Sequence, residues 1–150
     1  ILMVCLGNIC RSPLADGLLR KKIREAGLSV EVDSAGTSSH HIGQPPDERM
    51  RATAREFGLS IDDLRARQFI VSDFDQFDLI YAMDSSNYNN ILSLARSSAD
   101  KSIVKLILNE SEPGQNLNVP DPYFGGEQGF IDVYKMLDEA TDHIMDKLKK

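Results

Sequence analysis

Two kinds of apolar pattern alternate along this chain. Four short segments have the length and side chains of strands: residues 1–5, 30–34, 79–83 and 103–108. Four other segments repeat apolar residues at helical spacing: residues 13–27, 47–57, 85–95 and 130–148. The last has the clearest helical stripe, formed by Phe130, Val133, Tyr134, Leu137, Thr141, Ile144, Met145 and Leu148.

Residues that typically begin and end helices support this division. Ser12 and Pro13 are typical of an N-cap and a first helical residue, and Gly27 is typical of a helix end. Asp84 and Ser85 predict a helix start directly after the third strand. Strands that alternate with helices predict an α/β fold of three layers. We expect a four-stranded parallel sheet of strand order 2-1-3-4, with helices on both faces.

Composition narrows the range of functions. With 17 basic and 23 acidic residues the net charge is −6, which disfavours binding to nucleic acid. Two cysteines exclude a disulfide-rich scaffold and a zinc site of four thiolates. No apolar run approaches the ~20 residues of a membrane helix, and the apolar start lacks the basic flank of a secretory signal. We expect a cytoplasmic protein, with residues 1–150 in a single domain and neither nucleic acid nor a membrane as partner.

The loop after the first strand carries the most informative residues. In open parallel sheets, the loops at the carboxyl ends of the strands form the binding site. Cys5 ends the first strand, and Arg11 stands six positions later, where the first helix begins. Such a loop can turn successive N–H groups into one concavity above the positive end of a helix. This arrangement favours a bound anion.

The residue types in this loop fit a phosphate and a nucleophile. Gly7 permits a close approach of the backbone, and Asn8 tolerates a positive φ. Arg11 can meet two phosphate oxygens with its planar fork. The helix end and Arg11 favour the thiolate form of Cys5, to which Ser12 can donate a hydrogen bond. Attack of Cys5 on phosphorus would give a phosphocysteine that water then hydrolyses.

The same loop is also compatible with functions other than catalysis. The spacing of Cys5 and Arg11 alone is common by chance, and would also suit a structural cysteine and a solvated turn. Gly7, Asn8 and Ser12, in a strand–loop–helix setting, favour the catalytic interpretation. A Walker-type loop is excluded because there is no Gly-Lys-Ser or Gly-Lys-Thr ending. A module that binds phosphate without turnover stays open as the alternative from another functional class.

Departure of an alkoxide or phenoxide requires a positioned acid, and Asp121 is the best candidate. It stands between Pro120 and Pro122, in a loop that follows the last strand. The two prolines restrict the backbone, which suits a carboxylate held in one position. The same residue types are also typical of a simple Asx turn.

With both loops considered together, the chain resembles the low-molecular-weight protein tyrosine phosphatase family. The resemblance covers nearly the whole sequence. It is carried by residues 4–13 (VCLGNICRSP), 33–37 (DSAGT), 77–84 (FDLIYAMD) and 121–123 (DPY).

The resemblance implies a role for each site residue and no metal or cofactor. Cys5 is the nucleophile, Arg11 clamps the phosphate, and Asp121 acts as acid and then as base. Ser34 joins Asn8 and Ser12 in a hydrogen-bond network that supports the loop. The residues implied to bind phosphate or substrate are Leu6, Gly7, Asn8, Ile9, Cys10, Ser12, His40, Tyr123 and Phe124.

The resemblance also implies the substrates: phosphotyrosine-containing proteins and small aryl phosphates, bound by a monomer or weak dimer. The substrate ring lies between His40 on one loop and Tyr123 with Phe124 on another. His40 stands where relatives usually carry Trp or Tyr, so the wall on that side is thinner. Cys10 is implied to form a reversible disulfide with Cys5, and its residue type fits a packed small residue equally well.

Two related activities of this fold are distinguished by individual residues. Arsenate reductases of the fold use additional cysteines after a later strand, which this chain lacks. Protein arginine phosphatases carry Thr at the position of Ile9. A β-branched polar residue there favours a charged guanidinium group, whereas Ile9 favours an aromatic ring. We therefore expect phosphotyrosine as the substrate, with phosphoarginine as the alternative.

Overall fold

A parallel β-sheet forms the centre of the computed structural model. The structure describes residues 1–123 and 125–150, and four strands within them form this sheet in the order β2-β1-β3-β4. The strands are β1 (Leu2–Cys5), β2 (Asp33–Gly36), β3 (Ile80–Ala82) and β4 (Val104–Leu106). All three neighbouring pairs are parallel, which confirms the predicted fold class and strand order.

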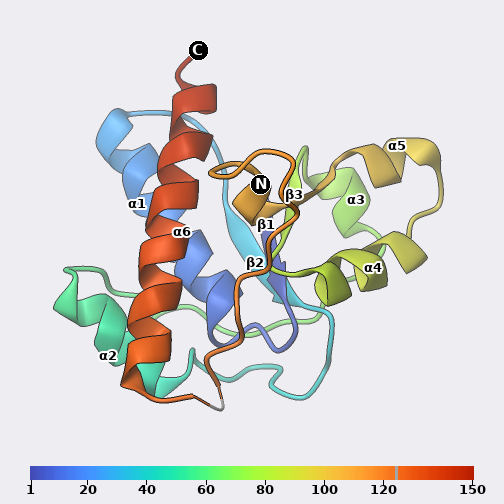
Figure 1. The fold of residues 1–150 in the computed structure, drawn as a ribbon. Helices are drawn as coiled ribbons and strands as arrows, with labels where there is room; N and C mark the ends of the chain where they lie inside the picture. Colours follow the sequence, from blue (N-terminus) through green and yellow to red (C-terminus); the bar gives the residue numbers. More distant parts are fainter. Residues whose placement is uncertain (124) are drawn as a thin grey trace.

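Helices cover both faces of this sheet (Figure 1). The face on the left of Figure 1 carries α1 (Arg11–Ala26), α2 (Glu48–Glu56) and α6 (Glu127–Leu148). The opposite side carries α3 (Asp73–Gln76), α4 (Ser85–Ser93) and α5 (Ser98–Ser102). A short 3₁₀ helix, η1 (Ile107–Asn109), follows β4. Among the described residues, none of these helices is long and apolar enough to cross a membrane.

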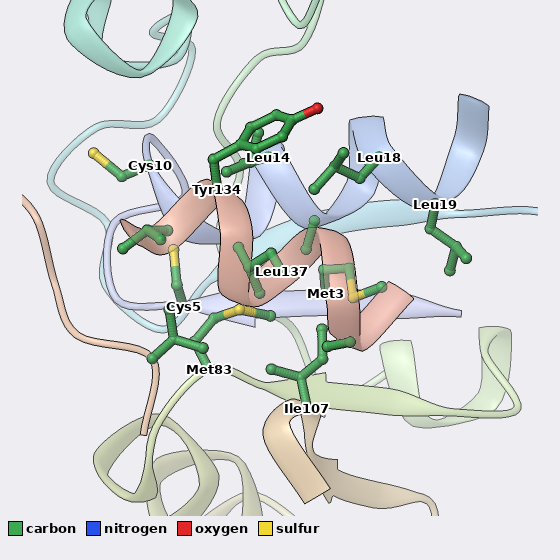
Figure 2. Packing of buried hydrophobic residues seen from close by; sticks show 14 of the residues in the cluster. Met3, Cys5, Cys10, Leu14, Leu18, Leu19, Met83, Ile107, Tyr134 and Leu137 are labelled. Atoms are coloured by element: carbon green, nitrogen blue, oxygen red, sulfur yellow. The ribbon is translucent and has the colours of Figure 1, made fainter. Parts of the chain in front are cut away.

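Successive residues of β1 point into two separate apolar cores. Leu2 and Val4 face α4, whereas Met3 and Cys5 face α1 and α6. Figure 2 shows the core between the sheet and helices α1 and α6, in which Met3 and Cys5 lie with Leu137 of α6 and apolar residues of α1. Because strand residues alternate between faces, the last residue of β1 carries its thiol toward the N-terminus of α1.

The first helix begins two residues earlier than predicted. The sequence predicts Ser12 as N-cap, but Cys10 occupies that position without a side-chain capping bond, and the helix starts at Arg11. The Ser12 hydroxyl is instead hydrogen-bonded to Cys5 and Asn8, so it is not available to cap the helix. Asp84, in contrast, caps α4 as predicted by accepting a hydrogen bond from the N–H of Asn87.

The second strand lies further along the chain than residues 30–34. Val30 and Val32 pack partly buried against the core, and pairing with β1 begins at Asp33. The strand ends at Gly36, where a Cβ would lie 2.7 Å from the carbonyl oxygen of Leu6. This close approach requires glycine and sets β2 against the loop that follows β1.

The remaining differences concern short elements and the start of α6, which begins at Glu127 rather than at residue 130. Strands β1, β3 and β4 are shorter at their ends than predicted, and α4 ends at Ser93 rather than near residue 95. Helices α3, α5 and η1 were not predicted. Each is too short to show a repeating apolar pattern, which a sequence-based prediction of a helix needs.

Candidate active site

The loops after β1 and β2 and the loop before α6 surround a small cavity. Its volume is about 140 Å³. The residues that line it are Cys5, Leu6, Gly7, Ile9, Cys10, Arg11, Ser38, His40, His41, Asp121 and Tyr123. Most of the residues that the sequence singles out therefore lie in one place.

The Cys5 thiol lies among hydrogen-bonding groups. Its Sγ is 3.0 Å from the Ser12 Oγ and accepts the backbone N–H of Asn8 at 3.3 Å. The N–H of Asn8 can point inward because this residue has a left-handed backbone, with φ of 57°. The backbone N–H of Asn8 and the Ser12 hydroxyl thus both lie at the sulfur.

The Asn8 side chain ties the loop to two other segments. Its Nδ2 donates to the Ser12 Oγ at 2.7 Å and to the Ser34 Oγ at 2.9 Å. Its Oδ1 accepts the backbone N–H of Arg67 at 3.0 Å, a partner that the sequence did not indicate. Asn8, Ser12 and Ser34 are all buried, so the network is shielded from water and holds the loop in its shape.

Arg11 lies beneath the loop with its side chain only 3% exposed. Its Nη1 donates to the Asp84 Oδ2 at 2.6 Å and to the carbonyl of Val119 at 3.0 Å. Burial alone would lower the pKa of Arg11, but the nearby charges of Cys5 and Asp84 raise it, so the guanidinium stays charged. These bonds fix the direction of the guanidinium plane at the cavity.

Asp84 is the functional residue that the sequence analysis missed as a partner of Arg11. The sequence indicated it as the cap of α4 and as part of a loop at the carboxyl end of a strand, but not as a partner of Arg11. It performs both tasks, with Oδ1 on the helix and Oδ2 on Arg11. The signal that points to this pairing is the strand order, because β3 lies next to β1 in the sheet. The residue after β3 therefore lies next to the loop after β1.

Asp121 lies at the rim of the cavity with its side chain 39% exposed. Its Oδ1 accepts the backbone N–H of Tyr123 at 3.0 Å, which is the Asx turn considered above. Its Oδ2 lies 3.7 Å from the Nη2 of Arg11. The turn and the proposed acid role are thus compatible, because one oxygen holds the loop and the other faces the cavity.

The outer walls of the cavity consist of His40, His41 and Tyr123. The rings of His41 and Tyr123 lie 6.3 Å apart between centroids, tilted by 46°. The Nδ1 of His41 lies 3.0 Å from the Oε1 of Gln44. His41 was not predicted as a wall residue, and nothing in its residue type distinguishes it from His40. Phe124, which the sequence placed on the opposite wall, lies outside the described residues.

Cys10 is buried beside the cavity and is not bonded to Cys5. Burial raises the pKa of its thiol, and the nearby carboxylate of Asp47 adds to the effect. Cys10 is therefore held as a neutral thiol. Across residues 1–123 and 125–150, no three His, Cys, Asp or Glu side chains are grouped as metal ligands.

Comparison with known proteins identifies the family. The model of the family described as low molecular weight phosphotyrosine protein phosphatase matches residues 1–150. This chain belongs to that family. The assignment makes the protein a phosphatase, which is a hydrolase of phosphoric monoesters.

Individual relatives span nearly the full length of the phosphatase. A low molecular weight phosphotyrosine protein phosphatase of Schizosaccharomyces pombe is 39% identical, over 97% of this chain and 94% of the relative. A protein tyrosine phosphatase structure from Entamoeba histolytica has a TM-score of 0.92 at 39% identity, over 99% of this chain and 95% of the other. The structure of a Drosophila arginine phosphatase has a TM-score of 0.91 at 29% identity, over 99% of this chain and 97% of the other.

Proposed function

We propose that this phosphatase hydrolyses phosphotyrosine in proteins, and small aryl phosphates, through a phosphocysteine intermediate on Cys5. One observation carries the proposal. The sulfur of Cys5 lies in a cavity, within hydrogen-bonding distance of Ser12 and the N–H of Asn8, and the cavity is also lined by the buried Arg11. A thiolate and a phosphate dianion would both be stabilised by these donors.

The reaction follows from the positions of three side chains. The Cys5 thiolate attacks phosphorus and forms an S–P bond while the P–O bond to the leaving group breaks. Asp121, at the rim, gives its proton to the departing oxygen. Asp121 then takes a proton from a water molecule that attacks phosphorus, the S–P bond breaks, and inorganic phosphate leaves. Arg11 stabilises the charge on the phosphoryl oxygens in both steps.

We assign phosphate binding to the loop itself. Its backbone N–H groups and the fork of Arg11 would hold the phosphoryl oxygens. The residues concerned are Leu6, Gly7, Asn8, Ile9, Cys10 and Ser12. Asn8, Ser12 and Ser34 support the loop through the buried network described above.

The walls of the cavity support an aromatic substrate. His40, His41 and Tyr123 offer ring surfaces at the mouth, and Ile9 offers an apolar side chain inside the cavity. An aryl ring would pack against these groups. Phosphoarginine is the second candidate because of the similarity to the Drosophila arginine phosphatase. Ile9 disfavours it, since an aliphatic side chain cannot hydrogen-bond a guanidinium group.

A comparison of two substrates tests this choice. We expect kcat/KM for a phosphotyrosine peptide to exceed that for the phosphoarginine peptide of the same sequence by about 10²-fold, the scale of discrimination at one polar or apolar contact. Ile9→Thr keeps the β-branch, replaces the ethyl group by a hydroxyl and should reduce this ratio. A wild-type ratio in favour of phosphoarginine would contradict the tyrosine assignment.

Asp121→Ala tests the general acid. We expect kcat/KM for phenyl phosphate, a poor leaving group, to fall by about 10²-fold, because nothing else protonates the phenoxide. For p-nitrophenyl phosphate, whose leaving group is stable as an anion, the fall should be several-fold smaller. Rates for a series of aryl phosphates measure the difference. An equal loss on every substrate would remove Asp121 from the acid role.

We further propose that the protein acts in the cytoplasm, without cofactor, as a monomer or weak dimer. Support for the compartment comes from the two free cysteines of the site, since thiols stay reduced in the cytosol. The reaction as written uses side chains and water alone. Light scattering across a range of protein concentrations measures the oligomeric state.

A further inference from the structure

The start of α2 lies between the phosphate loop and the loop that carries Asp121. Asp47 is the N-cap of this helix, and Arg49 belongs to its first turn. Figure 1 shows α2 beside the first turns of α6, where the Asp121 loop enters that helix. The mechanism proposed above uses neither residue.

Asp47 attaches the start of α2 to the phosphate loop. Its backbone N–H donates to the carbonyl of Ile9 at 2.7 Å. Its carboxylate receives two hydrogen bonds from the Arg49 side chain, Nε to Oδ1 and Nη2 to Oδ2, each 3.1 Å long. Partial burial alone would raise the pKa of Asp47, but the bonds from Arg49 lower it, so the pair stays ionised.

Arg49 attaches the same helix start to the Asp121 loop. Its Nη2 also donates to the carbonyl of Tyr123 at 2.9 Å. The guanidinium lies over two rings, with its central carbon 5.4 Å from the ring centre of Tyr123 and 4.8 Å from that of Phe130. Phe130 is only 1% exposed and belongs to α6, so one of these rings is part of the fixed core. Cations over aromatic faces are attracted to them.

These bonds form a continuous connection from one catalytic loop to the other. It runs from the Ile9 carbonyl through Asp47 and Arg49 to the Tyr123 carbonyl. The N–H of Tyr123 then holds the Oδ1 of Asp121. Before Asp121, the loop is attached through Val119, whose N–H and carbonyl bond to the Met83 carbonyl and to Arg11. Arg49 supplies an attachment on the other side.

We propose that Arg49 is a positioning residue that holds the Asp121 carboxyl at the distance from the phosphate loop that proton transfer requires. This inference rests on the proposed acid role of Asp121. Arg49 bonds to the Tyr123 carbonyl, and the Tyr123 N–H bonds to Asp121, so the proposed effect on proton transfer passes through Tyr123 to Asp121. A displacement of about 1 Å at such a group is enough to slow a reaction strongly.

Leaving-group dependence separates this role from a structural one. In Arg49→Ala we expect kcat/KM for phenyl phosphate to fall about tenfold, a part of the ~10²–10⁴-fold that a general acid supplies. The value for p-nitrophenyl phosphate should stay within about twofold, because that leaving group needs little protonation. Arg49→Lys keeps the charge but loses the fork, and should give an intermediate ratio.

Arg55 provides the matched control. It is also on α2 and exposed, and it pairs with Asp62 at 3.8 Å, away from the cavity. Arg55→Ala should leave the ratio of the two substrates unchanged. Thermal melts of both alanine variants show whether each of them folds. If Arg49→Ala folds poorly, the same kinetics measured for Arg49→Lys provide the test instead.

A double variant decides whether Arg49 acts through Asp121. In the Asp121→Ala background, Arg49→Ala should cause no further loss on phenyl phosphate, since residues that act as a unit are not additive. A full tenfold loss in that background, or an equal loss on both substrates, would overturn the inference. If Asp121→Ala itself shows no leaving-group dependence, the acid role fails instead, which is a different result from failure of Arg49 alone.

Discussion

Cys5→Ser is expected to abolish hydrolysis of p-nitrophenyl phosphate, with a fall in kcat of about 10⁴-fold or more, the scale seen when a covalent nucleophile is removed. A serine hydroxyl ionises far less readily than a thiol, so the donors around the sulfur cannot convert it to an anion. Asn8 and Ser12 would still hold the loop, and phosphate should therefore still bind. Initial rates and the inhibition constant of inorganic phosphate measure the two effects separately.

Cys10→Ser is the matched comparison, because Cys10 is the other cysteine of the chain and belongs to the same loop. Burial keeps Cys10 a neutral thiol, so it cannot replace Cys5 as nucleophile, and we expect most of the activity to remain. Rapid acid quenching and peptide mass spectrometry should find phosphate on Cys5 in the wild type. Retained turnover in Cys5→Ser, or phosphate on Cys10 instead, would contradict the phosphocysteine mechanism.

The phosphate loop and the fold class could be predicted from the sequence because both depend on local patterns. The phosphate loop is one continuous segment, and Cys5, Asn8 and Arg11 each have a residue type that serves one mechanical purpose there. The alternation of strands and helices was equally clear, and it indicated the fold class. Both follow from short-range rules, namely helix periodicity, capping and the position of binding loops in parallel sheets.

Contacts between distant segments account for what was missed. Asp84 is a good N-cap on any helix, and its second bond to Arg11 depends on β3 lying next to β1. Gly36 looks like an ordinary strand glycine until the carbonyl of Leu6 is placed 2.7 Å from its missing Cβ. The bond from Arg67 to Asn8 joins residues 59 positions apart. The residue types alone do not indicate such pairs, because each partner is also typical of its own local structure.

Arg11→Lys should lower kcat/KM by about 10²–10³-fold even though the positive charge is kept, a loss comparable to that of a main transition-state donor. The Nη1 of the guanidinium already donates to Asp84 and to the Val119 carbonyl, which leaves the other N–H groups for phosphate. A lysine ammonium has three donors on a single atom and cannot serve both sides at once. We expect the inhibition constant of inorganic phosphate to rise together with the loss of rate.

Asp84→Asn separates the position of Arg11 from its charge. Asparagine can still cap α4 through its carbonyl oxygen, so the helix should remain intact. The loss of the ion pair releases one side of the guanidinium, and we expect a fall in kcat/KM of about tenfold, within the range for a charged partner of a hydrogen bond. If Arg11→Lys were instead close to wild type in rate and phosphate inhibition, charge alone would be sufficient. The planar fork would then have no part in catalysis, and the contact with Asp84 would be purely structural.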